Sequence, residues 1–221
     1  MKTFKALGAL LAYPEPELIE ALGEIEEVIE AENLLPKVEV AALQRLTHIL
    51  RQTDLMALQE QYVDHFDRVR SLSLHLFEHV HGESRDRGQA MVDLNQLYAR
   101  QGLLLANHEL PDFLPAFLEY LSLLPYSEAV THLGDTVMIL DGIGARLAKR
   151  GSHYAAVFNA LLGFTGQRGA HTVIDDAEIR REDDPAEIDK LWAEQPAFGG
   201  APRQAAVSVI HFAKNHKGVS T

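Results

Sequence analysis

The chain has 221 residues, 47% of them hydrophobic, which is enough for one domain with a substantial core. It contains no cysteine, which excludes disulfides, cysteine-ligated zinc and iron–sulfur clusters held by its own thiolates, and fits a reducing compartment such as the cytoplasm. A formal net charge of −12 argues against nucleic acid and favours a basic peptide as partner, and without a secretory signal or a long apolar stretch we expect no membrane insertion.

Apolar residues recur at helical spacing along almost the whole chain, and no run of strict alternation before residue 170 predicts a strand. The first four helices are expected over residues 4–11, 18–29, 40–50 and 55–66. Pro14 and Pro16 end the first helix because a proline cannot donate the backbone hydrogen bond that continues it. Asp54 is placed to cap the fourth.

A short helix over about residues 72–80, a turn at Gly82 and a helix from Asp86 that Gly102 ends are expected next. A strongly apolar helix then runs from Pro111 to about residue 124 and should be central. Ser127 and Ser152 are placed to cap two more helices. We therefore predict an all-α fold, a single compact domain of about nine helices over residues 1–165.

The composition changes from Gly166 onward, and in residues 175–185 charged residues far outnumber apolar ones. Such a stretch is typical of a solvated linker. We expect residues 166–221 to form a charged linker and a loosely packed C-terminal tail. A short helix near residues 185–194 could dock through Ile188, Leu191 and Trp192.

The run from Arg68 to Gln89 carries the densest chemistry of the chain, including His75-x-x-Glu78-His79. On a helix, two imidazoles one turn apart can ligate zinc while the carboxylate acts as a general base, in the residue order of the inverted zincin motif. A metallopeptidase would also need a third ligand, and Glu109, Asp112 and Glu119 serve that argument equally well.

The structural alternative is that both histidines are partly buried and paired with acidic neighbours, while arginines balance the acids. The acids would be Glu78, Glu83 or Asp93, and the arginines Arg68, Arg70, Arg85 and Arg87.

A small-ligand or nucleotide-binding helical module is a further alternative, since glycines cluster at residues 142–144 and 163–169. Neither cluster follows a strand or carries a phosphate-loop lysine, and no second Glu-x-x-His motif indicates a metal bundle.

Residues 62–68, Tyr-Val-Asp-His-Phe-Asp-Arg, and the stretch from Ser71 to Leu94 together resemble the signature of the NarJ family. These are cytoplasmic chaperones that assemble the molybdenum-containing catalytic subunit of membrane-bound respiratory nitrate reductase. The resemblance extends to residues 10–14, 109–112 and 117–121 and covers roughly residues 4–165.

The resemblance implies an all-helical fold shared with the wider TorD/DmsD group, with no catalytic activity and no bound cofactor or metal. Such a protein binds the N-terminal segment of the apo catalytic (alpha) subunit and keeps it competent for insertion of the molybdenum cofactor and the iron–sulfur cluster before membrane docking. Proteins that insert the molybdenum cofactor are further partners to expect. In one departure, Phe113 stands where the group commonly has histidine, which puts any ligand- or peptide-binding role of that histidine in doubt.

The candidate client-binding face gathers aromatic and charged residues around the NarJ-like signature. It comprises Tyr62, Phe66, Arg70, His75, Glu78, His79, Glu83, Arg85, Arg87, Asp112, Glu119 and Tyr120. Core packing explains Tyr62 and Phe66 equally well, and intramolecular pairing explains the arginines.

Because histidines titrate near neutral pH, we predict that the affinity for the client peptide changes between about pH 6 and 8. The histidines concerned are His65, His75, His79 and His81.

Overall fold

The computed structural model of the chain describes residues 1–80, 85–106, 109–166, 172–184 and 186. Within these ranges the regular secondary structure is helical and no strand occurs, which confirms the predicted all-α class. The α-helices are α1 (Lys2–Leu10), α2 (Pro16–Glu32), α3 (Lys37–Gln52), α4 (Leu55–Tyr62), α5 (Arg85–Arg100), α6 (Leu114–Ser122), α7 (Tyr126–Gly134), α8 (Val137–Lys149), α9 (Ala155–Phe164) and α10 (Asp176–Glu182). A π-helix (Val63–Asp67) continues α4, and two 3₁₀ helices follow at Arg70–Leu72 and Leu76–His79.

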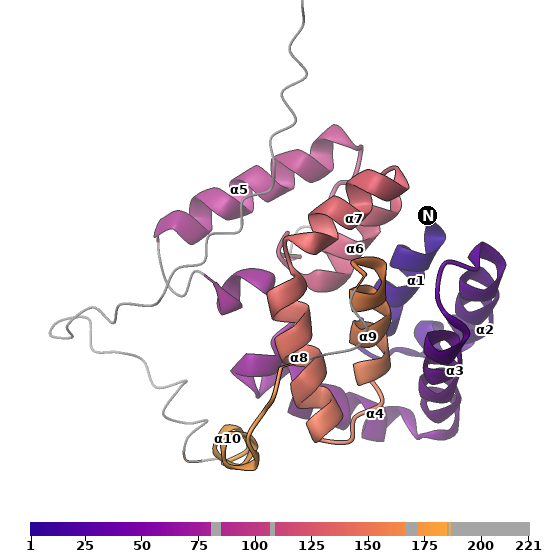
Figure 1. The fold of residues 1–221 in the computed structure, drawn as a ribbon, viewed down its shortest axis with the longest axis vertical. Helices are drawn as coiled ribbons and strands as arrows, with labels where there is room; N and C mark the ends of the chain where they lie inside the picture. The colour runs from indigo at the N-terminus through magenta and orange to yellow at the C-terminus, as the bar shows by residue number, and fades with distance from the viewer. Residues whose placement is uncertain (81–84, 107–108, 167–171, 185, 187–221) are drawn as a thin grey trace, which may run out of the picture.

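Helix α6 lies at the centre of the core, as its all-round apolar character predicts. Its residues Leu114, Phe117, Leu118 and Leu121 are completely buried. Helix α1 packs closely against α6 through Gly8, where a Cβ atom would lie 3.1 Å from the carbonyl oxygen of Pro115. Figure 1 shows α2 and α3 along one side of the bundle, α5 reaching away from it, and α10 beside the end of α8.

Several helix ends follow the local sequence signals. The side chain of Asp54 accepts the backbone N–H of Met56 at 3.0 Å, which confirms it as the cap of α4. Gly102 adopts a left-handed conformation with φ of 78° just after α5, so its predicted role in ending that helix is also confirmed. Pro16 occupies the first position of α2, where its missing N–H costs no helical bond.

Other boundaries differ from the prediction. Helix α6 begins at Leu114 and not at Pro111, because Asp112 is drawn into the core before the helix starts. The single helix expected from Ser127 is divided at Thr136, whose hydroxyl donates to the carbonyl of Leu133 at 2.8 Å. Neither Ser127 nor Ser152 is a cap, since Pro125 and Tyr154 hold those positions.

The region after residue 166 is more ordered than a solvated linker over part of its length. Ile174 is buried, the backbone N–H of Thr172 donates to the Asp141 carboxylate at 2.8 Å, and α10 begins with a side-chain cap from Asp175. The short helix expected near residues 185–194, with Ile188, Leu191 and Trp192, lies outside the described residues. Of the helices that are described, none combines the length and the apolar character needed to cross a membrane.

Candidate functional site

The segment from Leu74 to Phe77 is joined by its backbone to the residues that precede α6. The N–H of Leu114 donates to the carbonyl of Leu74 at 2.8 Å, and the N–H of Leu76 donates to the carbonyl of Asp112 at 2.9 Å. These bonds form an isolated antiparallel bridge between His75 and Phe113. The prediction of one helix over residues 72–80 is therefore wrong, because backbone groups that an α-helix would use internally bond across to residues 112–114.

Asp112 is the buried centre of this junction. Its carboxylate, which is completely buried, accepts the backbone N–H of Phe77 at 3.1 Å and lies 3.3 Å from Nδ1 of His75. Nη2 of Arg87 lies 3.9 Å from the Asp112 oxygen that accepts from Phe77, and 3.7 Å from a carboxylate oxygen of Glu78. We call His75, Glu78, Arg87 and Asp112 the charged cluster. A buried carboxylate held in this way is compensated by hydrogen bonds and opposite charge.

The two histidines of the motif lie in different environments. The hydrogen bond to Asp112 raises the pKa of His75 despite its partial burial, so the protonated ring is favoured there. Burial lowers the pKa of His79, whose Nε2 lies 2.8 Å from the carbonyl oxygen of Ser73. The neutral ring of His79 is thus suited to donate that hydrogen bond.

This geometry does not support the zinc interpretation of His75-x-x-Glu78-His79. His75 precedes the 3₁₀ helix on which Glu78 and His79 lie, so the two rings do not share one face of an α-helix. In the part of the chain that the structure describes, no group of three or more His, Asp or Glu side chains is placed to hold a metal ion.

A cavity of about 290 Å³ opens beside the charged cluster, and we call it the charged pocket. It is lined by Arg68, Val69, Arg70, Ser71, Glu78, His79 and Glu182. Arg68, Ser71, Glu78 and His79 come from the NarJ-like signature, Val69 and Arg70 lie between its two stretches, and Glu182 comes from α10. Three predicted site residues, Arg70, Glu78 and His79, therefore meet at one cavity.

Other predicted site residues belong to the core. Tyr62 and Phe66 pack ring to ring with centroids 4.9 Å apart, and Phe66 meets Tyr154 at 5.2 Å. The Tyr62 hydroxyl donates to the carbonyl of Leu11 at 3.0 Å, and burial raises its pKa. Of the two interpretations open for Tyr62 and Phe66, core packing is the one that their contacts support.

Tyr120 and Glu119 lie on α6 and contact residues outside the charged cluster. Tyr120 stacks on Tyr98 with centroids 4.9 Å apart, and burial raises its pKa to about 12. Glu119 forms a surface ion pair with Lys5 at 2.6 Å. Glu83 lies outside the described residues, as does the side chain of Arg85, so neither is placed relative to this site.

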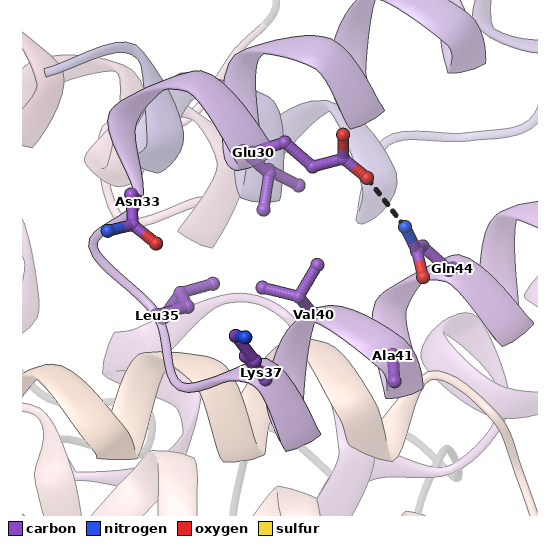
Figure 2. Close-up of a pocket in the computed structure, with 8 residues that line it drawn as sticks. Glu30, Asn33, Leu35, Lys37, Val40, Ala41 and Gln44 are labelled. Carbon is purple, nitrogen blue, oxygen red and sulfur yellow. Dashed lines mark hydrogen bonds between the residues drawn. The ribbon is translucent and has the colours of Figure 1, made fainter.

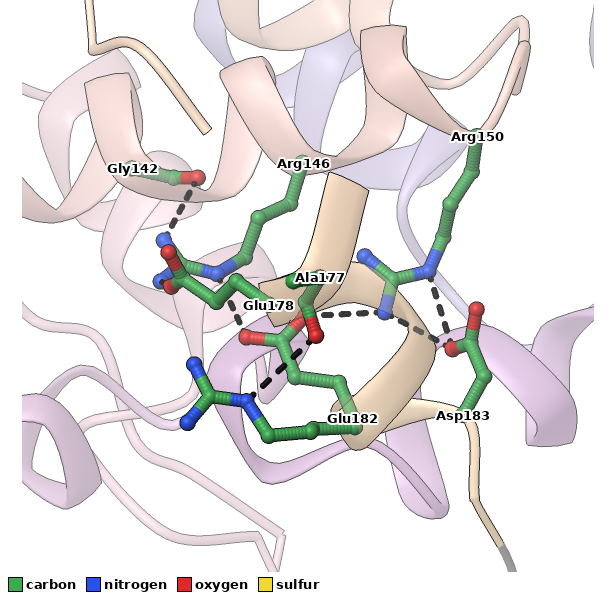
Figure 3. A network of polar contacts seen from close by, with 8 residues as sticks. Gly142, Arg146, Arg150, Ala177, Glu178, Glu182 and Asp183 are labelled. Atoms are coloured by element: carbon green, nitrogen blue, oxygen red, sulfur yellow. Dashed lines mark hydrogen bonds and ion pairs between the residues drawn. The ribbon is translucent and has the colours of Figure 1, made fainter. Parts of the chain in front are cut away.

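Arg146, Arg150 and Glu182 were missed by the sequence analysis. Figure 3 shows that Arg146 and Arg150 reach from α8 to the acidic side of α10. Nε of Arg146 donates to Glu182 at 2.8 Å, and Nη2 of Arg150 donates to the other carboxylate oxygen of Glu182 at 2.9 Å. Burial alone would raise the pKa of Glu182, but these hydrogen bonds outweigh it and the pKa is lowered. The available signal was the spacing of four between two arginines on one helix, together with the acid-rich run after residue 174.

A second cavity of about 290 Å³ lies between α2 and α3 (Figure 2). Its lining is Ile29, Glu30, Asn33, Leu35, Lys37, Val40, Ala41 and Gln44. The side-chain amide of Gln44 donates to Glu30 at 2.7 Å and links the two helices. None of the predicted site residues lines this cavity.

Comparison with known proteins agrees with the signature around the charged cluster. The family model of the nitrate reductase delta subunit matches residues 31–160. The chain is 46% identical over 196 residues, 86% of its length and 81% of the relative's, to the nitrate reductase molybdenum cofactor assembly chaperone NarJ of Escherichia coli (strain K12). It is 40% identical over 197 residues, 88% and 82% of the two chains, to NarW of the same organism, a probable chaperone of the same description. A probable NarJ chaperone of Bacillus subtilis (strain 168) is 28% identical over 182 residues, 79% of this chain and 94% of the relative. The chain therefore belongs to the nitrate reductase delta subunit family, together with the NarJ chaperones.

Proposed function

We propose that the protein is a dedicated chaperone for the maturation of respiratory nitrate reductase. It binds the apo catalytic (alpha) subunit in the cytoplasm, through that subunit's N-terminal segment. It keeps the subunit competent for insertion of the molybdenum cofactor and the iron–sulfur cluster until membrane docking. The observation that carries the proposal is the likeness, over most of the chain, to relatives named as assembly chaperones.

The charged cluster and the charged pocket supply a suitable contact surface. Arg70 is exposed, and the His75, Glu78 and Arg87 side chains are partly exposed, so a peptide can reach all four. Beneath them, the buried Asp112 and the core aromatics Tyr62 and Phe66 support the backbone that presents these side chains. A net charge of −12 would speed the encounter with a basic segment, and the binding would weaken as salt screens that attraction.

The proposed role in nitrate reductase maturation is tested in cells that make nitrate reductase but lack this protein. We expect the catalytic subunit to accumulate without molybdenum cofactor and nitrate reductase activity to be low, with both restored by the wild-type chain. A pull-down should recover the apo catalytic subunit with this protein. Full cofactor content in its absence would contradict a chaperone role.

The contact surface is tested separately by calorimetry with the N-terminal peptide of the catalytic subunit. Glu78→Gln should weaken peptide binding on the order of tenfold while leaving the melting temperature nearly unchanged. The matched control is Glu24→Gln, a change of the same chemistry at an exposed position of α2, which should alter neither quantity. If Glu78→Gln lowers only the melting temperature, Glu78 supports the fold and the client binds elsewhere.

A further inference from the structure

Helix α10 is held against α8 by charge and not by apolar packing. None of its residues is buried. Its acidic side chains and Asp183 meet three basic residues at the end of α8, namely Arg146, Lys149 and Arg150. Lys149 pairs with Asp176 at 2.6 Å, and Arg150 pairs with Asp183 at 2.8 Å. Most docked helices are held by an apolar stripe, so this one is unusually dependent on ion pairs.

The residues before α10 are attached more firmly. Ile174 is buried in the domain, and Thr172 bonds to the buried Asp141 on α8 through both its N–H and its hydroxyl. Asp175 separates this fixed point from α10 and has an extended backbone conformation, with ψ of 142°. A rotation of the backbone at residue 175 would carry α10 away from α8 and would leave Thr172 and Ile174 in place.

Glu182 connects this docking to the charged pocket. It accepts from both Arg146 and Arg150, and its side chain also forms one wall of the cavity whose other walls are residues 68–71, Glu78 and His79. When α10 lies against α8, that side of the pocket is closed. When α10 leaves, Glu182 leaves with it and the cavity becomes an open groove beside α8.

We propose that α10 is a strap, latched by ion pairs, that closes the charged pocket and must open before a client segment occupies it. The motion of the strap follows from its own contacts with α8, whereas the identity of the incoming segment rests on the proposed function. The pairs Lys149–Asp176 and Arg150–Asp183 each include an exposed carboxylate and are screened by salt, whereas the pairs of Glu182 with Arg146 and Arg150 are more buried and are screened less. Because a client can enter only the open fraction of molecules, latching lowers its apparent affinity by that fraction.

The motion of the strap is measured without any client. The chain has no cysteine, so Ala148→Cys on α8 and Ala177→Cys on α10, both at exposed positions, accept a single pair of nitroxide labels. Electron paramagnetic resonance should give a short, narrow distance distribution in about 50 mM NaCl, and a longer, broader one in about 1 M NaCl, where screening is several-fold stronger. A distribution that stays short and narrow in high salt would overturn the strap.

Charge variants test the latch at constant salt. Lys149→Glu should lengthen the label distance, and the swap Lys149→Glu with Asp176→Lys should restore it, because the pair is re-formed with its signs exchanged. The control is Arg180→Gln, an exposed change on the same helix at a residue that does not pair with α8, which should leave the distance unchanged. Failure of the swap to restore the short distance would contradict the ion-pair latch.

The regulatory role is tested by calorimetry with the same N-terminal client peptide. Lys149→Glu should raise its affinity by up to about tenfold, and the swap should return it to the wild-type value. If the label distance responds and the affinity of a bound peptide does not, the strap moves but does not control the site. If no peptide binds to any variant, the proposed function fails, while the label distances still decide whether α10 is a strap.

Discussion

Asp112 holds Phe77 in place from within the core, its completely buried carboxylate accepting the Phe77 backbone N–H at 3.1 Å. The two residues belong to segments that are far apart in the sequence and are also joined by backbone bonds on either side. The position of Glu78 and His79, which follow Phe77 directly, therefore depends on a carboxylate that solvent never reaches.

Replacement of Asp112 tests this dependence. Asp112→Ala leaves the Phe77 N–H buried without its acceptor and should lower the free energy of unfolding by about 3 kcal/mol. Asp112→Asn keeps one acceptor oxygen for Phe77 and should cost less, although it removes the charge that faces His75 and Arg87. Urea denaturation of both variants measures the difference. Equal losses would mean that the charge, and not the hydrogen bond to Phe77, accounts for the stability.

The two histidines should give the stability opposite dependences on pH. His75 has a raised pKa in the folded state, so its contribution is fully present below the ordinary value near 6.5 and is lost as pH rises through the folded value. His79 has a lowered pKa, so its contribution is present above about 6.5 and is lost as pH falls through the folded value. Unfolding free energies measured from about pH 5 to 9 should show that His75→Gln removes the loss on the alkaline side only.

Client binding should also depend on pH. Because the His75 ring is partly exposed and its protonation is coupled to Asp112, the affinity for the N-terminal client peptide should change between about pH 6 and 8. His75→Gln should flatten this profile. Calorimetry at constant ionic strength provides the measurement, and an affinity that is constant in the wild type across that range would contradict the prediction.

The contact between α1 and α6 should tolerate no side chain at residue 8. In Gly8→Ala the new methyl group would lie 3.1 Å from the Pro115 carbonyl oxygen and 3.3 Å from Cβ of Leu118, and the variant should lose about 1–3 kcal/mol of stability. Gly23→Ala is the matched control, since no atom lies within 4 Å of the added group on α2. Helix propensity should make this control about 0.5–1 kcal/mol more stable. Chemical denaturation of the pair separates crowding from propensity.

The all-α class and the central place of α6 could be predicted because both are encoded in local apolar spacing. The structure of residues 72–80 could not be predicted in the same way. The leucines of this segment suit a helix, but backbone hydrogen bonds from Leu74 and Leu76 to residues 112–114 override that preference, and no local sequence pattern indicates such a pairing. The docking of α10 was missed for a similar reason. A run of acids with few apolar residues is typical of a solvated segment, and the arginines that bind it lie about thirty residues earlier in the chain.

The π-helix over Val63–Asp67 sets the orientation of the residues that follow it around the helix axis. The N–H of Arg68 bonds to the carbonyl of Val63, five residues back, so this turn holds one residue more than an α-helical turn would. Each extra residue rotates whatever follows by about 100° around the helix axis. Deleting one residue here would allow a regular α-helical turn to form. It would also rotate Arg68 and Arg70 around the helix axis relative to the buried Tyr62. The length of this one turn thus contributes to the direction from which Arg68 and Arg70 reach the charged pocket.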